Sequence, residues 1–409
     1  MHSRLFLFNP TNEMAIANGQ ISYMPPRHLQ EFEQDLATLP WILGEENDFV
    51  LVPDKAAHSL DHLKETGWSI PQVVSSPQDL PKQARGNLFF EPWGWSPAVY
   101  RKFKPFFDLA HPDWNHYPFA SWHPRFADLL SRETGYRLLR VLKDIGSGNK
   151  KEYPLLYLPQ DPMIIEKESD LPAILKKFSP PLLIKTPWSA SGRGIFRVRD
   201  ITDDPAQSNW IKGMLRRQGK IYIEKMLDKV QDVSFQFWIE GGKINYEGHN
   251  FFYSDEKGQF AGCAIGPPEN ADPLFDDHRV VYDAIEQAAD LIEKGILSMF
   301  PNLNYYGPAG VDGIFFRDEG GALKLHPCLE INLRHNMGLA NIRLKRHIHP
   351  EAKGIWKTEL FKDTEWSRFC RNRKKENPPG FSEGKLRKGF LSLTNPTGNK
   401  QFGVWLELE

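Results

Sequence analysis

Oxygen-bearing and basic side chains alternate along the stretch EINLR at 330–334. Alternate residues of a β-strand face the same side, so a strand here would present Glu330, Asn332 and Arg334 together. Asp312 lies on the neighbouring strand of the same predicted hairpin and is expected to face them. Two carboxylates and an amide oxygen are hard ligands that suit Mg²⁺ beside phosphate, and an arginine suits a phosphoryl oxygen. The alternative is a strand whose polar face meets solvent.

A second stretch, PLLIKTPWSASGRGIFRV at 181–198, places a lysine at the mouth of a small-residue loop between two predicted strands. Successive backbone N–H groups in such a loop form a concave set of donors for phosphate oxygens. Lys185 adds a positive charge at the base of the loop and Arg193 adds one near its tip. The loop has no Walker A pattern, and a strand follows it instead of a helix. An ordinary surface hairpin is the alternative.

A third stretch, IYIEKML at 221–227, reads as a short apolar strand that ends in a charged pair. By itself, Glu224 beside Lys225 would be an exposed ion pair at the end of a strand. Its interest comes from its position between the loop and the EINLR stretch.

In chain order, the segments IKTPWSASGRG, EKML, VD (Val311-Asp312) and EINLR resemble the pattern of the ATP-grasp superfamily, which includes biotin carboxylase and D-alanine–D-alanine ligase. The resemblance covers about residues 130–348. It implies an α+β fold in which two α+β subdomains clasp ATP, preceded by a Rossmann-like α/β domain. It also implies an ATP- and Mg²⁺-dependent ligase that joins a carboxylate to an amine or similar nucleophile through an acyl phosphate.

The resemblance further implies a nucleotide site. Lys185 would contact the α-phosphate and the adenine, and the loop would close over the β- and γ-phosphates with Ser189, Ser191, Gly192, Arg193 and Gly194. The EKML segment would be the hinge between the two subdomains and would hold the adenine edge with Glu224, Lys225 and Leu227. Asp232 lies where the family places a ribose contact.

The metal and catalytic positions follow in the same way. Asp312, Glu330 and Asn332 would hold Mg²⁺, and Arg334 would steady the transferred phosphate. Arg334 and Lys185 are therefore the predicted catalytic residues. Arg132 stands at the start of the first helix, where the family usually has a lysine, and is assigned to the nucleotide.

The strand and helix patterns divide the chain into an α/β domain at 1–128, an ATP-grasp domain at 129–348 and a C-terminal extension at 349–409. The first domain has apolar strands that run into polar loops, as in a parallel sheet, whose ligands sit at the carboxyl ends of the strands. Those strands are expected at 5–8, 49–52 and 87–90, helices at 131–145, 171–178 and 276–300, and a C-terminal hairpin at 390–394 and 402–408.

The composition is that of a globular protein. The chain has 409 residues, 40% of them hydrophobic, and a formal net charge of −1. A near-neutral chain lacks the basic footprint of a nucleic-acid or anionic-membrane partner, so we expect a small-molecule or peptide substrate. The N-terminal apolar run is too short for a signal peptide, and no segment could span a membrane. Cys263, Cys328 and Cys370 match no zinc or disulfide spacing, which favours a reducing, cytoplasmic location.

Two other functions stay open at this point. One is an ATP-binding module without chemistry. The other is a carbohydrate-binding protein, suggested by Trp93, Trp95, Trp114 and Trp122, since aromatic rings stack on sugars. The acceptor substrates are not identified, and the candidate contacts for them are His249, Asn250, Tyr253 and Arg279, against the alternative of ordinary polar loop residues.

Overall fold

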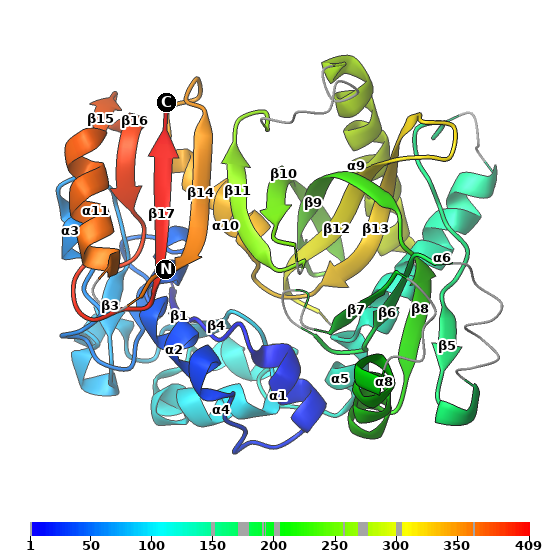
Figure 1. The fold of residues 1–409 in the computed structure, drawn as a ribbon. Helices are drawn as coiled ribbons and strands as arrows, with labels where there is room; N and C mark the ends of the chain where they lie inside the picture. The colour runs from blue at the N-terminus through cyan, green and yellow to red at the C-terminus, as the bar shows by residue number, and fades with distance from the viewer. Residues whose placement is uncertain are drawn as a thin grey trace.

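The computed structural model describes residues 2–148, 152–170, 180–189, 192, 194–199, 205–256, 258–268, 277–299, 305–362 and 365–409. The strands in these ranges form a parallel sheet of four strands, an antiparallel sheet of four strands and a sheet of nine strands (Figure 1). The parallel sheet belongs to the blue and cyan N-terminal part. The four-stranded antiparallel sheet lies at the lower right, below the yellow strands of the large sheet.

The N-terminal sheet is parallel throughout, with the order β3-β2-β1-β4. Its strands are β1 (Ser3–Leu7), β2 (Phe49–Leu51), β3 (Gln72–Val74) and β4 (Leu88–Pro92). Short apolar runs buried on both faces are typical of such a sheet. The predicted parallel sheet is confirmed, and β3 is an additional edge strand whose short, partly exposed sequence gave no clear pattern.

Short helices cover this sheet, and a long segment rich in aromatic residues, here called the aromatic segment (91–126), follows it. The α-helices are α1 (Asn12–Asn18), α2 (Arg27–Asp35), α3 (Asp61–Lys64), α4 (Pro97–Phe103) and α5 (Arg125–Leu129). The 3₁₀ segments are η1 (Leu39–Leu43), η2 (Pro77–Asp79), η3 (Lys82–Ala84), η4 (Lys104–Leu109) and η5 (Pro112–His116).

The aromatic segment forms part of the core. Trp93, Trp95 and Trp114 are buried, and Trp95 stacks on Phe119 at a centroid distance of 5.3 Å. Trp122 packs against this core and is partly buried. Three of the four rings proposed for sugar stacking are thus enclosed by protein, and the carbohydrate-binding interpretation loses its basis.

The small antiparallel sheet has the order β5-β8-β6-β7. Its strands are β5 (Met163–Ile165), β8 (Ile221–Lys225), β6 (Leu182–Lys185) and β7 (Ile195–Val198), with η6 (Glu168–Asp170) and helix α8 (Pro205–Gln218) alongside. Ile184 and Ile223 of the sheet and Ile211 of α8 share one core. The predicted loop hairpin is confirmed, because β6 pairs with β7 and Lys185 lies opposite Ile195.

The nine-stranded sheet has the order β13-β12-β9-β10-β11-β14-β17-β16-β15. Its strands are β9 (Asp228–Glu240), β10 (Lys243–Ser254), β11 (Phe260–Ile265), β12 (Gly307–Arg317), β13 (Leu323–Asn332), β14 (Gly354–Leu360), β15 (Gly380–Ser382), β16 (Lys385–Ser392) and β17 (Phe402–Leu408). The remaining helices are α6 (Arg132–Gly148), α9 (His278–Met299), α10 (Met337–Leu344) and α11 (Glu365–Glu376), with η8 (Lys345–His347).

The two faces of β9 differ in polarity. Phe235 and Phe237 belong to the same core as Ala288 and Ile292 of the predicted helix α9. The residues that alternate with Phe235 and Phe237 along β9 face the other way, so the side chain of Ser234 lies on the opposite side of the sheet. This alternation gives the part of the large sheet around β9 an apolar face under α6 and α9 and a polar face opposite, whereas β11, β14, β16 and β17 contribute to a second apolar core with α10.

Two features of the large sheet have simple physical causes. β13 runs unbroken through Pro327, which is tolerated because β13 is the edge strand of its sheet. The C-terminal hairpin is confirmed as β16 and β17, but it extends the nine-stranded sheet through β14 and β11. The predicted helix at 171–178 lies outside the described residues.

This architecture confirms the predicted α+β fold with a preceding parallel α/β unit, which is the arrangement that the ATP-grasp resemblance implies. The three cysteines are buried and unbridged. None of the helices in the described part of the chain has the length and apolar character that a membrane crossing requires.

Candidate functional site

The acidic residues of the EINLR hairpin meet on the polar face of the large sheet. Asp312 on β12 lies directly opposite Glu330 on β13. The side-chain amide of Asn332 donates to Asp312 Oδ2 at 2.9 Å and reaches Glu330 Oε1 at 3.5 Å. We call Asp312, Glu330 and Asn332 the acidic cluster.

Helix α6 brings a buried arginine to this cluster. Arg132 Nη1 lies 2.5 Å from Glu330 Oε2, and the same guanidinium donates to Thr186 O and Ser189 Oγ at 3.1 Å each. The helix approaches β13 closely because Gly135 has no side chain, and a Cβ there would lie 3.1 Å from Glu330 Cα. Arg132 therefore connects the loop hairpin to the acidic strand.

A second charged group lies at the base of the loop. Lys185 Nζ is 2.5 Å from Glu224 Oε2, and Tyr136 of α6 donates its hydroxyl to Glu224 Oε1. The lysine and glutamate side chains are 3% and 19% exposed. We call Lys185, Glu224 and Tyr136 the hinge cluster. Glu224 pairs here with Lys185 and not with its neighbour in the chain, so the simple exposed ion pair is wrong.

The two clusters differ in their protonation equilibria. Burial would raise the pKa of Glu224, but the charge and hydrogen bond of Lys185 outweigh burial and lower it. Burial and then the facing Glu330 carboxylate raise the pKa of Asp312 well above its usual range. Burial would also raise the pKa of Glu330, but Arg132, Arg334 and Lys185 lower it. The ionised Asp312 thus lacks full compensation.

Arg334 joins the acidic cluster to the N-terminal domain. Its Nη2 donates to Asn332 Oδ1 at 2.8 Å, and its Nε donates to Glu13 Oε1 at 2.8 Å. The next residue, His335, contacts Glu91 of β4 with its Nε2 at 3.1 Å. These acidic partners were not singled out by the sequence, although both lie where β1 and β4 reach their carboxyl ends. Tyr136 was also missed, because it read only as part of an apolar helix face.

The other predicted hinge and ribose residues lie around these clusters. Asp232 is buried on β9, two residues from Ser234, which pairs with Asp312 in the next strand. Its carboxylate accepts from Lys229 at 2.6 Å and from Ser254 at 2.7 Å. Leu227 is half-buried between β8 and β9. Lys225 is exposed and pairs with Glu319 at 2.6 Å, so the structure does not bring it to the hinge cluster.

The described residues of the loop contact helix α6, strand β6 and the turn between β10 and β11. Ser189 Oγ accepts a hydrogen bond from Arg132. The carbonyl of Gly194 accepts a hydrogen bond from the backbone N–H of Thr186 at 3.0 Å. Gly192 lies against the carbonyl of Gly258 in the turn between β10 and β11. Ser191 and Arg193 lie outside the described residues.

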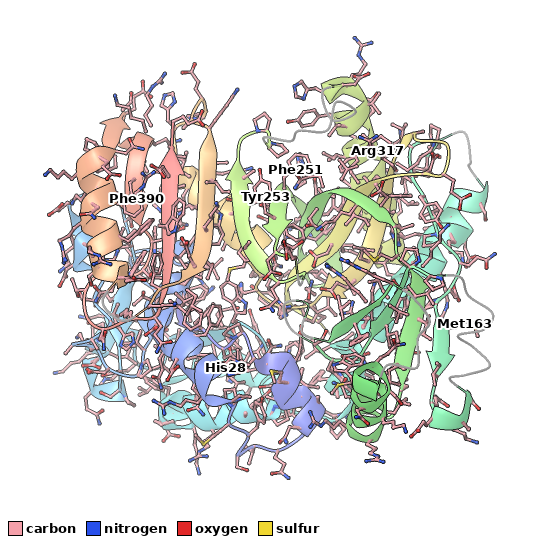
Figure 2. The ribbon with its side chains drawn as sticks, viewed as in Figure 1. His28, Met163, Phe251, Tyr253, Arg317 and Phe390 are labelled. Atoms are coloured by element: carbon pink, nitrogen blue, oxygen red, sulfur yellow. The ribbon has the colours of Figure 1, made fainter. Side chains whose placement is uncertain are left out.

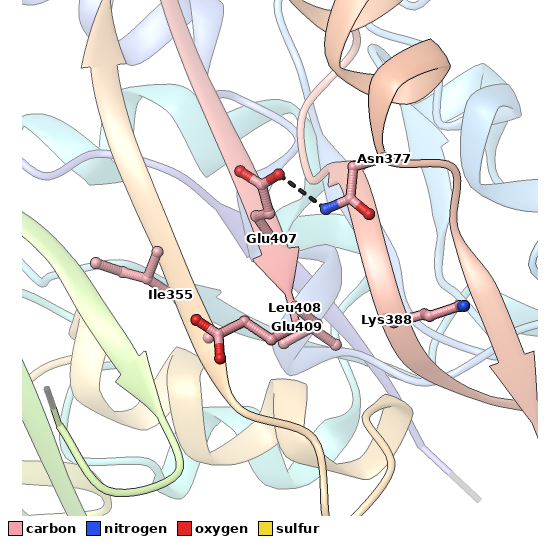
Figure 3. Close-up of a pocket in the computed structure, with 7 residues that line it drawn as sticks. Ile355, Asn377, Lys388, Glu407, Leu408 and Glu409 are labelled. Atoms are coloured by element: carbon pink, nitrogen blue, oxygen red, sulfur yellow. Dashed lines mark hydrogen bonds between the residues drawn. The ribbon is translucent and has the colours of Figure 1, made fainter.

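Two cavities lie elsewhere. One, of about 380 Å³, lies among β14, β16 and β17, where Glu407 accepts from Asn377 (Figure 3). The other, of about 220 Å³, is lined by His249 and Asn250 together with Tyr282 and Lys345. Neither is lined by the acidic or the hinge cluster, so residue chemistry and not cavity size selects the candidate site.

The remaining acceptor candidates separate. Tyr253 lies on β10 near Phe251 (Figure 2) and packs against the main core, while Arg279 is exposed on α9. Only His249 and Asn250 of the four candidates line the smaller cavity described here. Their role as substrate contacts stays a prediction.

Known structures with a similar arrangement include nucleotide complexes. The chain is similar over its full length to 93% of N5-carboxyaminoimidazole synthetase from Staphylococcus aureus complexed with ADP, at 13% identity and a TM-score of 0.45. It is similar over its full length to 88% of biotin carboxylase from Campylobacter jejuni in complex with a β,γ-ATP ligand, at 11% identity and a TM-score of 0.49.

A third similar structure is the biotin carboxylase domain of the Hydrogenobacter thermophilus 2-oxoglutarate carboxylase, with MgADP and bicarbonate. It shares 12% identity over the full chain and 86% of that domain, at a TM-score of 0.47. No family model and no curated protein matches the chain. At these identities and scores, the case for a function rests on the residues of the site.

Proposed function

We propose that this protein is an ATP- and Mg²⁺-dependent ligase of the ATP-grasp type, which joins a carboxylate to an amine or similar nucleophile through an acyl phosphate. The observation that supports it most is the bridge made by Arg132. One buried guanidinium contacts Ser189 of the loop and Glu330 of the acidic cluster. A phosphate-binding loop and a metal-binding strand must meet in this way if they act on the same phosphates.

In this proposal the hinge cluster receives the adenine end of ATP. Lys185 would hold the α-phosphate, Glu224 and the backbone of Leu227 would hold the adenine edge, and Asp232 would contact the ribose. Ser189, Gly192 and Gly194, with Ser191 and Arg193, would bind the β- and γ-phosphates through backbone and side-chain donors.

The acidic cluster fits Mg²⁺. Asp312 and Glu330 face each other on paired strands, and burial together with this repulsion raises the pKa of Asp312. A cation held by Asp312 and Glu330 would remove the repulsion and neutralise phosphate charge, and the Asn332 oxygen, which accepts from Arg334 in this structure, would join these ligands if the amide turned. No group of three or more histidine, cysteine or acidic residues suited to a metal occurs in the described ranges. Two carboxylates with phosphate and water as further ligands is the pattern Mg²⁺ prefers.

The chemistry needs two transfers. An oxygen of the substrate carboxylate bonds to the γ-phosphorus as the bond from that phosphorus to ADP breaks. The amine nitrogen then bonds to the acyl carbon, and phosphate leaves with the electron pair of the broken C–O bond. Arg334, which donates to Asn332, would steady the transferred phosphoryl group.

We also propose the domain limits 1–128, 129–348 and 349–409. The pairing of β11 with β14 supports a C-terminal extension that completes the large sheet of the preceding domain. We propose a small-molecule or peptide substrate and no nucleic-acid partner, in keeping with the near-zero net charge.

A screen of pooled carboxylates and amines tests the function. We expect ADP and phosphate release only when Mg²⁺, ATP and one acceptor pair are present together. If Mg-ATP binds but no carboxylate in a broad pool gives phosphate release or a hydroxylamine-trapped acyl group, an ATP-binding module without chemistry is the better description.

A further inference from the structure

Two side chains at the start of α1 lie beyond the carboxyl ends of the parallel strands, where ligands of such a sheet usually bind. In the order β3-β2-β1-β4, the chain leaves β1 toward one side of the sheet and returns on the other side as β4. The gap beyond the carboxyl ends of β1 and β4 is therefore the topological switch point of the sheet. Asn12 and Glu13 begin α1, the first helix after β1, and lie near this point.

Close contacts join the loop after β1 to the loop after β4. Asn9 donates to the carbonyl of Gly94 at 2.7 Å and accepts from Gly94 N at 3.3 Å. A Cβ on Gly94 would lie 2.2 Å from Cγ of Asn12, so only glycine leaves room for the Asn12 amide. The position of Asn12 is thus built by both loops.

Both side chains carry an acceptor without a partner. Glu13 and Asn12 are 7% and 3% exposed. Glu13 Oε2 and Asn12 Oδ1 are buried and have no hydrogen-bond partner in the described part of the chain. Buried polar atoms in native proteins are nearly always paired, so each of these two atoms points to a missing donor.

A single residue, Arg334, connects Glu13 to the proposed phosphoryl site. The other oxygen, Glu13 Oε1, accepts from Arg334 Nε at 2.8 Å, and Arg334 Nη2 donates to Asn332 of the acidic cluster at 2.8 Å. A nucleophile held by Glu13 Oε2 would therefore lie beside the carbonyl of an acyl phosphate held at Arg334. Burial raises the pKa of Glu13 against the opposing effect of Arg334, which suits a proton acceptor.

We propose that Asn12 and Glu13 form the binding site for the amine substrate, and that the amine is a primary one which donates N–H bonds to Glu13 Oε2 and Asn12 Oδ1. The role in catalysis rests on the proposed ligase function. As the nitrogen bonds to the acyl carbon and phosphate departs, the nitrogen gives up one proton to Glu13 Oε2. The nucleophile class is then an amine and not a thiol or an alcohol.

A binding experiment tests the site without needing the reaction. Thermal melting of the full chain is measured with methylammonium chloride and with tetramethylammonium chloride at equal concentration, because the second cation has the charge but no N–H group. We expect methylammonium to raise the melting temperature by about 1–3 °C relative to tetramethylammonium. Glu13→Gln should abolish this difference, and Asn12→Leu should reduce it if the first variant folds poorly.

Glu33 provides a matched control. It is another buried carboxylate of the same domain, but its oxygens accept from Thr11 at 2.6 Å and Lys102 at 3.4 Å. Glu33→Gln should keep the difference between the two salts. Equal melting in both salts for the wild type, or a difference that persists in both Glu13→Gln and Asn12→Leu, would overturn the proposal.

Mg-ATP melts of the same variants separate this inference from the proposed function. No Mg-ATP shift in the wild type would count against the ligase and leave the amine result readable. With an active acceptor pair, Glu13→Gln should raise KM for the amine at least about tenfold and change KM for ATP by less than about threefold. If it instead lowers carboxylate-dependent ADP formation with the amine KM unchanged, Glu13 only positions Arg334 and the proposal is wrong.

Discussion

At the hinge cluster a lysine faces a glutamate, whereas at the acidic cluster an aspartate faces a glutamate. Lys185 lies 2.5 Å from Glu224 and lowers the pKa of that carboxyl against burial. Asp312 lies opposite Glu330, and burial and this neighbour raise its pKa. The Glu224 charge is balanced by Lys185 within the protein, whereas the ionised form of Asp312 lacks full compensation and would be favoured by an added cation. We therefore expect the hinge cluster to contribute to stability and the acidic cluster to favour cation binding.

The largest expected effect comes from breaking the balanced pair. Lys185→Met should leave Glu224 buried without its counter-charge, which costs about 3–5 kcal/mol when a buried pair is broken. The melting temperature should fall clearly in calorimetry. Lys185→Met combined with Glu224→Gln removes both charges and should regain most of the stability.

The same double variant should still bind Mg-ATP weakly. Loss of a hydrogen bond to a charged group is worth about 1.5–3 kcal/mol, or roughly tenfold to a hundredfold in affinity. Unchanged Mg-ATP affinity in the double variant would mean that the hinge pair is purely structural.

The acidic cluster should respond in turnover instead of stability. Glu330→Gln keeps the shape and removes one charge, so we expect kcat to fall about a hundredfold or more, in line with the loss of a preorganised electrostatic group. KM for ATP should change less, because the charge acts mainly as the phosphoryl group transfers. Kinetics at several Mg²⁺ concentrations would check this, and near-full turnover at low Mg²⁺ would make the strand structural.

A smaller effect of opposite sign is expected at Asp312. Asp312→Asn removes the repulsion with Glu330 and should stabilise the nucleotide-free protein by about 0.5–2 kcal/mol. It should also remove most of the added stability that Mg-ATP gives. Lowering the pH protonates Asp312 in the wild type. The difference in the free energy of unfolding between the wild type and Asp312→Asn should therefore shrink in acid. A variant that is less stable at neutral pH would contradict the account of this cluster.

A comparably small effect concerns a histidine beside the hinge cluster. Burial lowers the pKa of His326 to about 4, with a smaller opposing effect of Glu224. The unfolded chain takes up a proton near the ordinary pKa of 6.5, so stability is lost as pH falls below that value. The loss at pH 5.5, relative to alkaline pH, should be about 1.4 kcal/mol and should be absent in His326→Gln. Urea denaturation at several pH values would measure it.

Features governed by local chain geometry were predictable from the sequence. The period of a strand places Glu330, Asn332 and Arg334 on one face, and the apolar stripe of α9 predicts its helix. The hairpin that carries Lys185 followed from two apolar runs around a small-residue loop. Their functional roles stay predictions.

Features that depend on which elements pack together were not predictable. Tyr136 reaches Glu224 because the start of α6 lies beside β8, where the ring centroids of Tyr136 and Tyr222 are 4.7 Å apart. Glu13 reaches Arg334 because the loop after β1 lies beside the end of β13. No local pattern states such pairings. The same reason explains why β14 was missed as the strand that joins the C-terminal hairpin to β11.

The most direct test of the central claim is a calorimetric titration of the full chain with a non-hydrolysable ATP analogue, with and without Mg²⁺. The account predicts saturable binding that is markedly tighter with Mg²⁺, with the Mg²⁺ effect lost in Asp312→Asn and Glu330→Gln. At a hundred times the dissociation constant, the analogue with Mg²⁺ should stabilise the wild type by about 2.7 kcal/mol. No binding at millimolar analogue, or binding unaffected by Mg²⁺ and by both substitutions, would contradict it.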